Sequence, residues 1–262
     1  ALPVAPTATT TIDYCEDDAA VALSATASSG HTLVWYGSDG TTVLSGAPTP
    51  STSSAGTTNY YVAQNATLTD CEGPKTTITV TVSGTPVAPT VSDVSYCNNE
   101  TATALTATAS TGNTLVWYDA SQTGITTPTP STSSVGSVTY YVAQQTASGC
   151  EGPKSLVTVT INALPVAPTA TTAIAYCKDA TATALTATAS GSHTLVWYDT
   201  DGTTVLSGAP TPSTSSVGTT TYYVAQNNTL TSCEGPQTTI TITVNALPVA
   251  PTATTTIDYC ED

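Results

Sequence analysis

Alternating polar and apolar residues predict β-strands along almost the whole chain. Threonine alternates with small or branched apolar residues in stretches such as TTITVTV at 76–82 and TATALTATA at 101–109. This period of two places successive side chains on opposite faces of a strand, and threonine and valine both favour strands. No window has the i, i+3, i+4 and i+7 apolar spacing of an amphipathic helix. We therefore expect an all-β protein with almost no helix.

The pentapeptide TLVWY marks an internal repeat. It occurs at 32–36, 114–118 and 194–198 and contains all three tryptophans, which are 82 and 80 residues apart (117 − 35 and 197 − 117). A unit of about 80 residues suits a small β-sandwich domain, whereas solenoid coils are about 20–45 residues long. The expected domains are residues 1–83, 84–162 and 163–245. Residues 246–262 repeat residues 1–17 without change, so we interpret them as the first strand of a truncated fourth repeat in an excerpt from a longer array.

Every repeat has the same order of segments. A proline-rich segment (LPVAPT or TPVAPT) precedes a Tyr-Cys pair, an alternating strand, TLVWY, a Pro-Thr-Pro stretch, YYVAQ, CEGP and a final Thr/Ile/Val strand. About seven short strands around a central tryptophan predict an immunoglobulin-like sandwich. The final strand runs almost directly into the next proline-rich segment, and such short, extended linkers do not swivel freely. The array is therefore expected to be a semi-rigid rod.

Charge and composition narrow the range of functions. The net charge is −15, and lysine and arginine together number only three. An acidic chain does not suit nucleic acid, whose phosphates need a basic surface. No apolar run approaches the ~18 residues of a membrane-spanning helix, so direct membrane insertion is not expected. No motif is typical of an active site, and we predict neither catalytic activity nor a cofactor.

The recurring motifs resemble those of a known group. The pairs YC at 14–15 and WY at 35–36, with TYYVAQ at 139–144 and GCEG at 149–152, are similar to immunoglobulin-like repeats of giant Bacteroidota cell-surface proteins and gliding or adhesion filaments. The resemblance covers the whole chain. It implies a non-enzymatic stalk or fibre of an extracellular filament or cell-surface adhesin, exported through a type IX pathway. The implied partners are neighbouring repeats of the same chain and other copies in a filament.

Two other functions are compatible with the same motifs. The first is an adhesive module that binds protein or surface carbohydrate through aromatic side chains such as Tyr36 and Tyr61. The second is a set of accessory domains of a secreted enzyme, which would need a catalytic domain elsewhere.

A comparison with antibody variable domains predicts the core. Their F strand reads Tyr-Tyr-Cys-Ala, whereas Tyr60-Tyr61-Val62-Ala63 has valine in place of the cysteine. Leu23, twelve residues before Trp35, stands where the partner cysteine would be. We therefore expect an apolar cluster in place of the usual disulfide, with a tyrosine corner beside it. The predicted core residues are Leu23, Trp35, Tyr60 and Val62, then Leu105, Trp117, Tyr140 and Val142, then Leu185, Trp197, Tyr222 and Val224.

Seven cysteines predict disulfides and an oxidising compartment, which favours an extracellular or cell-surface location. They are Cys15, Cys71, Cys97, Cys150, Cys177, Cys233 and Cys260. One pairing stays within a repeat and joins Cys15 to Cys71. The other joins successive repeats, because the two cysteines of one sandwich are expected at opposite ends, and would pair Cys15 with Cys150. Both pairings remain open at this point.

Weaker site predictions concern a metal and glycans. An acidic group before the second strand could hold calcium through carboxylate oxygens, although a solvated acidic turn is the simpler interpretation because the third repeat has Ala175 and Lys178 there. The group comprises Asp13, Glu16, Asp17 and Asp18. Three glycosylation sequons begin at Asn65, Asn99 and Asn227.

Overall fold

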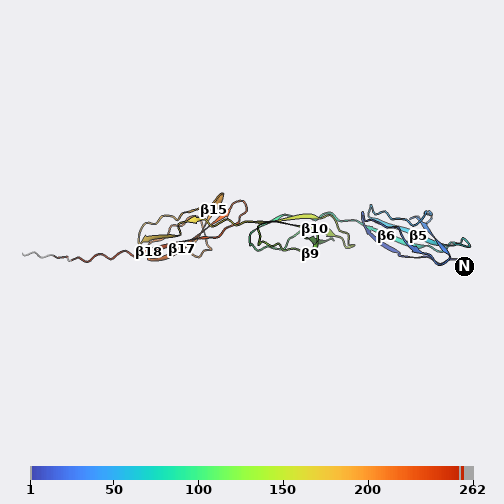
Figure 1. Ribbon diagram of the computed structural model, residues 1–262, viewed down its shortest axis with the longest axis horizontal. Coiled ribbons are helices and arrows are strands. Elements are labelled where there is room, and N and C mark those ends of the chain that lie inside the picture. The colour runs from blue at the N-terminus through green and yellow to red at the C-terminus, as the bar shows by residue number, and fades with distance from the viewer. Residues whose placement is uncertain (1, 254, 257–262) are drawn as a thin grey trace, which may run out of the picture. The chain divides into compact units, whose positions relative to one another are not determined.

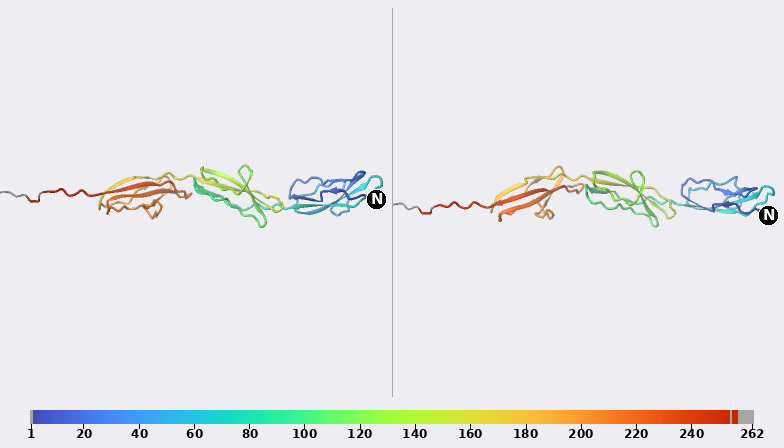
Figure 2. Two further views of the ribbon diagram at one scale, coloured as in Figure 1. Left: turned by 90° about the horizontal axis from the view of Figure 1, so that it is seen from below. Right: turned by 60° about the horizontal axis from the view of Figure 1, so that its bottom comes forward.

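A computed structural model describes residues 2–253 and 255–256. These residues form eighteen strands and no helix. The ribbons in Figures 1 and 2 accordingly show no helical coil. The all-β prediction is confirmed: the chain consists of immunoglobulin-like sandwiches in tandem. The predicted disulfide residue Cys260 lies outside the described residues.

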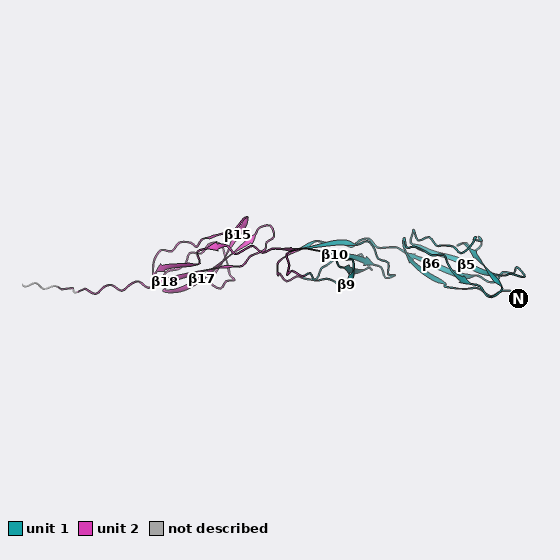
Figure 3. Ribbon diagram, in the orientation of Figure 1, with its two compact units in different colours: residues 1–94, 103–130, 138–159 teal, residues 95–102, 131–137, 160–262 magenta. Residues whose placement is uncertain are grey.

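The chain divides into two compact units (Figure 3). The first comprises residues 1–94, 103–130 and 138–159, and the second comprises residues 95–102, 131–137 and 160–262. The division therefore runs through the second domain and leaves the first and third domains whole.

The first domain pairs its strands as an immunoglobulin sandwich does. Its strands are β1 (Thr7–Ala8), β2 (Thr11–Cys15), β3 (Ala25–Thr26), β4 (His31–Tyr36), β5 (Gly56–Ala66) and β6 (Thr76–Ser83). One sheet has the order β2-β6-β5-β4, in which β2 is parallel to β6 and the other neighbours are antiparallel. Strand β1 pairs with β3 in a second, two-stranded sheet. The register sets Trp35 opposite Val62 and Tyr60 opposite Ile78, which directs the apolar residues of each strand to one face.

The second and third domains repeat this plan with an added edge strand. The second has β7 (Val94–Cys97), β8 (Thr114–Tyr118), β9 (Gly124–Ile125), β10 (Gly136–Gln145) and β11 (Ser155–Asn162), in the sheet order β7-β11-β10-β8-β9. The third has β12 (Thr169–Ala170), β13 (Ala173–Cys177), β14 (Ala187–Thr188), β15 (His193–Tyr198), β16 (Val205–Leu206), β17 (Gly218–Asn228) and β18 (Thr238–Asn245). Its main sheet has the order β13-β18-β17-β15-β16, with β12 and β14 paired separately.

A leucine, a tryptophan and a valine form the centre of each core. In the first domain Leu23, Trp35 and Val62 lie in one buried cluster with Ile78 and Val80. The third domain has the equivalent cluster of Leu185, Trp197, Val224, Ile240 and Ile242, and the second buries Leu105, Trp117, Val142, Val157 and Val159. The first tyrosine of each YYVAQ segment is half-buried, namely Tyr60, Tyr140 and Tyr222. Tyr60 and Tyr222 pack against their clusters. Their role as tyrosine corners stays a prediction.

The alternating segment before TLVWY forms less regular sheet than its pattern predicts. Within residues 101–109 only Thr108 forms a β-bridge, and β3 and β14 are two residues long. The facing proline explains the difference: the Leu105 N–H donates to the Pro128 carbonyl at 2.9 Å, but proline has no N–H to return a second bond. The prediction of one continuous strand here is wrong, although Leu105 is buried as expected.

Candidate functional site

Two disulfides join successive domains. Cys15 bonds to Cys150 and Cys97 bonds to Cys233, with Cα atoms 5.5 Å apart in each pair. The cysteine of the Tyr-Cys pair, here called the first-position cysteine, ends strand β2 or β7. The cysteine of Cys-Glu-Gly, the second-position cysteine, follows β10 or β17 by a short loop. Each bond lies within one compact unit. Of the two pairings that the sequence allows, the structure therefore has the one between successive repeats.

Strand topology prevents a bond within a repeat. Cys15 pairs with Ser83 at the end of β6, whereas Cys71 precedes the start of β6 at Thr76. Thr76 and Ser83 are seven residue steps apart along β6, which is about 23 Å at about 3.3 Å per residue. Bonded cysteines need Cα atoms within about 7 Å, so Cys15 cannot reach Cys71.

Each disulfide encloses one linker between domains. The loop closed by Cys15 and Cys150 contains the proline-rich segment at 85–90, and the loop closed by Cys97 and Cys233 contains that at 164–169. The loops overlap because Cys97 lies between Cys15 and Cys150 in the chain. A single backbone cut in either linker would therefore leave the two flanking domains covalently joined.

Two cysteines are free among the described residues. Cys71 and Cys177 are both unbonded and exposed, so the predicted disulfides are not formed at these two of the six matched cysteines in this structure. The pattern of bonding explains why: a first-position cysteine bonds the second-position cysteine of the next repeat. Neither Cys71 nor Cys177 has such a partner in the described part of the chain. The bonded Cys150 and Cys233, in contrast, are 1% and 0% exposed.

A glycine lets the second-position loop approach the proline-rich segment. A Cβ atom on Gly73 would lie 2.5 Å from the carbonyl oxygen of Pro3. In the other domains, Cβ atoms on Gly152 and Gly235 would lie 2.0 and 2.2 Å from the carbonyl oxygens of Pro86 and Pro165. No side chain fits at these distances, so the glycine of CEGP is required by close approach of two backbones.

The glutamate of the same loop binds the tyrosine of TLVWY. The Tyr36 hydroxyl donates to the Glu72 carboxylate, and Tyr118 and Tyr198 donate to Glu151 and Glu234 in the same way. Burial raises the pKa of Tyr36 to about 12, and the hydrogen bond to Glu72 and the negative charge of that residue act in the same direction. The pKa values of Tyr118 and Tyr198 are raised to about 12 for the same reasons.

This arrangement removes one predicted ligand-binding side chain. Tyr36 is only 6% exposed, so its ring is not available to a glycan, and its interpretation as a surface aromatic is wrong. In the first domain Lys75 covers the ring, with its Nζ atom 3.5 Å from the ring centroid, and Lys154 covers Tyr118 at 3.3 Å. Such cation–π contacts stabilise an exposed site by about 0.5–1 kcal/mol. In the third domain Gln237 stands in place of the lysine and donates to the Gly202 carbonyl at 3.0 Å.

A buried glutamine connects the proline-rich segment to the sandwich. Gln144 is 1% exposed; its Nε2 donates to the Val87 carbonyl, and its Oε1 accepts the Ser110 N–H at 2.7 Å. Gln64 and Gln226, both 0% exposed, make the same contacts in the other two domains. The sequence analysis did not identify this role. The available signal was that YYVAQ ends in glutamine in all three repeats. Alternation along the strand places this residue on the core-facing side, where an apolar residue is expected.

The acidic group proposed for calcium is engaged in a turn. The Asp18 carboxylate accepts a hydrogen bond from the Cys15 N–H at 2.7 Å, and the backbone carbonyl of Asp18 accepts one from the Thr52 hydroxyl. Asp17 takes a left-handed φ of 65° in the same turn. Among residues 2–253 and 255–256, no three histidine, cysteine, aspartate or glutamate side chains gather as a metal site would require.

Two of the sequon asparagines lie in strands. Asn65 lies in β5 opposite Thr32, and its Nδ2 donates to the Asp70 carboxylate at 2.6 Å. The Oδ1 atoms of Asn65 and of Asn227 in β17 are buried and have no hydrogen-bond partner. Asn99 lies in a turn with a φ of 63°. Glycosylation of these residues stays a prediction.

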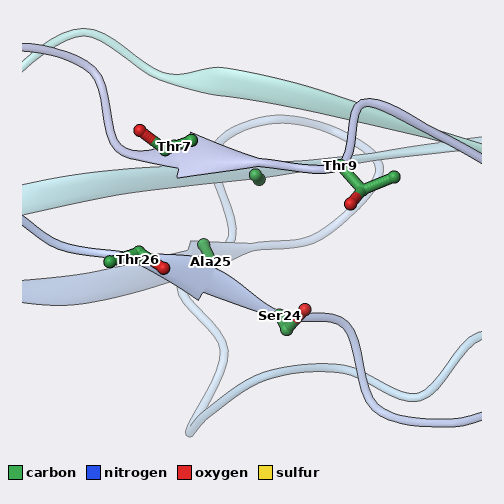
Figure 4. A pocket seen from close by; sticks show the side chains of 6 residues that line it. Thr7, Thr9, Ser24, Ala25 and Thr26 are labelled. Carbon is green, nitrogen blue, oxygen red and sulfur yellow. The ribbon is translucent and has the colours of Figure 1, made fainter.

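The hollows on the surface offer little chemistry. Figure 4 shows one of them, where Thr7 and Thr9 face Ser24, Ala25 and Thr26 across β1 and β3. Equivalent hollows in the other domains are also lined by threonine, serine, alanine and valine. These linings have no charged or aromatic side chain.

In the part of the chain that the structure describes, no helix is long and apolar enough to cross a membrane.

Comparison with known proteins identifies the domain type. A family model described as "Ig-like domain CHU_C associated" matches three segments, residues 3–83, 86–163 and 165–246. No curated protein matches the chain.

Solved structures resemble the chain at low identity and low TM-score. An I-band fragment of titin is 11% identical with a TM-score of 0.38, and the match covers 93% of this chain and 98% of that one. The fibronectin(III)-like modules of Clostridium thermocellum CbhA are 15% identical with a TM-score of 0.34, over 63% of this chain and 96% of that one. The insect immune protein hemolin is 9% identical with a TM-score of 0.31, over 94% and 78%.

Proposed function

Because the chain belongs to the family of CHU_C-associated immunoglobulin-like domains, in three tandem copies, we propose that it is a stalk or fibre segment of a bacterial extracellular filament or cell-surface adhesin. Tandem immunoglobulin-like domains serve as structural or adhesive modules, and the fold is typically non-enzymatic. The proposed role is mechanical: the domains hold a distal part of the protein away from the cell and resist bending and proteolysis.

The disulfides around the linkers are the observation that carries this proposal. A single short linker lets one domain pivot on the next, because inter-domain motion is the default when few contacts cross a boundary. A second covalent connection between the same two domains turns that pivot into a two-point attachment. Cys15–Cys150 and Cys97–Cys233 supply this second connection at both linkers.

Several features favour an extracellular setting for such a stalk. Disulfides form and persist in oxidising compartments. The surface of the chain is rich in threonine and serine and contains only three lysines and no arginine, so trypsin-like proteases have few sites. The four bonded cysteines keep the domains connected even after a cut in a linker. These properties suit a protein that is exposed to proteases outside the cell.

Stiffness in solution tests the proposal. Small-angle X-ray scattering and negative-stain electron microscopy would compare the oxidised chain with a variant in which Cys15, Cys97, Cys150 and Cys233 are all serine. We expect the oxidised chain to be a thin rod with a domain repeat of about 3–4 nm, from strands of 6–10 residues plus loops. The variant should give a smaller radius of gyration and images bent at the linkers. Freely hinged domains in the oxidised chain would contradict the stalk, and specific binding on a glycan array would favour the adhesive alternative.

A further inference from the structure

We infer that Cys71 and Cys177 are the open ends of a disulfide series and that each takes a complementary cysteine from another immunoglobulin-like domain of this kind. Cys71 would take a first-position cysteine and Cys177 a second-position cysteine. The occupant is a domain of a neighbouring copy of this chain, or an adjoining domain of a longer chain, and both present the same chemistry. The inference extends the proposed stalk, but its test does not depend on stiffness.

The backbone around Cys71 matches that of the bonded second-position cysteines. The Ala66 N–H donates to the Cys71 carbonyl at 3.0 Å, and the carbonyls of Cys150 and Cys233 accept equivalent bonds at 2.9 Å. The residue before each cysteine is left-handed, with φ values of 52° at Asp70, 89° at Gly149 and 57° at Ser232. The free cysteine is therefore held in the conformation that its two counterparts have when bonded.

The backbone around Cys177 likewise matches the bonded first-position cysteines. Cys177 pairs with Asn245 on the last strand of its domain, as Cys15 pairs with Ser83. The N–H after each cysteine donates to that partner residue's carbonyl, at 2.8 Å from Lys178 and 2.8 Å from Glu16. Two residues after Cys177, Asp179 has a φ of 62°, and Asp17 has 65°.

Exposure distinguishes the free positions from the occupied ones. Cys150 and Cys233 are almost completely buried in their bonds, whereas Cys71 and Cys177 are exposed. Both thiols can therefore be reached without unfolding the domain. Since a bonded position in one domain and a free position in another have the same local structure, the missing component at the free position is the partner cysteine.

The bond forms by thiol–disulfide exchange with a small disulfide such as oxidised glutathione. The Cys177 thiolate attacks one glutathione sulfur, and a glutathione thiolate leaves. The Cys71 thiolate of another copy then attacks the mixed disulfide, and the second glutathione thiolate leaves. The two cysteines lose two protons and two electrons, and oxidised glutathione is reduced to two molecules of glutathione.

Complementation between two variants tests the inference. Cys71→Ser and Cys177→Ser are each made in the full chain with Cys260→Ser, oxidised at high concentration with a glutathione redox buffer, and run on a non-reducing gel. Each variant alone should stay at the monomer mass of 26.3 kDa, whereas a mixture of the two should shift to twice that mass and return to monomer on reduction. Trypsin cleaves after Lys75, Lys154 and Lys178, so the dimer should contain residues 1–75 of one copy linked to residues 155–178 of the other.

Two results would overturn the inference. One is dimer formation by either variant alone to the same extent as in the mixture, which would mean that any exposed thiol reacts. The other is a mixture that stays monomeric while Cys15–Cys150 is intact in its peptide map. Pairing between domains of one longer chain would be distinguished by the same linked peptides in material that keeps the mass of a single chain on a non-reducing gel. Failure of this pairing would not change the scattering test of the stalk.

Discussion

Replacing Gln144 by leucine tests the role of the buried glutamine. Its amide is the only polar side chain that the second domain buries almost completely among the described residues, and it connects Val87 to Ser110. Leucine keeps the volume but leaves the Val87 carbonyl and the Ser110 N–H without these partners. We expect the second domain to lose stability while the first and third keep theirs.

The structure places the expected loss of stability per unpartnered group near the lower end of its usual range. An unpartnered buried polar group costs about 1–3 kcal/mol. Val87 and Ser110 are themselves exposed, so water can reach part of the site, and we take about 1 kcal/mol for each group. The total of about 2 kcal/mol corresponds to an increase of about 30-fold in the open population. Gln144→Glu should cost more, because it also places a carboxylate in a buried position.

Hydrogen exchange with mass spectrometry measures this effect domain by domain. Slowly exchanging amides of β8, β10 and β11 should exchange about 30-fold faster in Gln144→Leu, whereas peptides from the other domains serve as internal references. Gln145→Leu is the matched control on the same strand, because Gln145 is only half-buried and its Nε2 bonds Gly149. Equal exchange in Gln144→Leu and Gln145→Leu would refute the reasoning.

Three further predictions concern packing and pH. Gly235→Ala forces a Cβ to within 2.2 Å of the Pro165 oxygen and should lower the melting temperature by an amount equivalent to about 1–3 kcal/mol. Gly208→Ala is the control, because its Cβ meets nothing within 4 Å and should change the melting temperature little. Equal melting temperatures for the two variants would contradict the contact. Trp117→Ala should destabilise its domain by about 3–5 kcal/mol in urea unfolding, and a cost below about 1 kcal/mol would show that the tryptophan is not central. The folded-state pKa of Tyr36 is raised to about 12 from an ordinary value of 10.0, so the stability that this tyrosine contributes is complete below pH 10 and is lost as the pH rises toward 12. Absorbance titration should show this tyrosine and its two equivalents ionising later than the others, and phenylalanine at all three should remove the late phase.

The repeat and its core could be predicted because they depend on side-chain pattern. The spacing of the tryptophans set the domain size. Leucine and valine occupy the positions of the two antibody cysteines, and this substitution predicted the apolar cluster of Leu23, Trp35 and Val62. The family match and the absence of helices in the described residues agree with that fold.

Features that depend on backbone contacts could not be predicted from the same pattern. The alternation of TATALTATA suggested a regular strand, but the outcome was decided by Pro128 on the facing segment, which lacks an N–H. Glu72 accepts the hydroxyl of Tyr36 and Lys75 lies over its ring, and nothing in the period of the strand shows these contacts. Topology did, in contrast, favour the correct disulfide pairing, because the position of Cys15 at one end of β6 follows from strand direction alone.

Peptide mapping under non-reducing conditions tests the central claim most directly. The chain is unfolded, its free thiols are alkylated, and trypsin cuts after its three lysines, Lys75, Lys154 and Lys178, since it has no arginine. The observed pairing predicts one disulfide-linked species containing residues 1–75, 76–154 and 179–262, with residues 155–178 released carrying an alkylated Cys177. Separate fragments 1–75 and 76–154, each with an internal disulfide, would contradict a covalent link between successive domains and with it the proposed stalk.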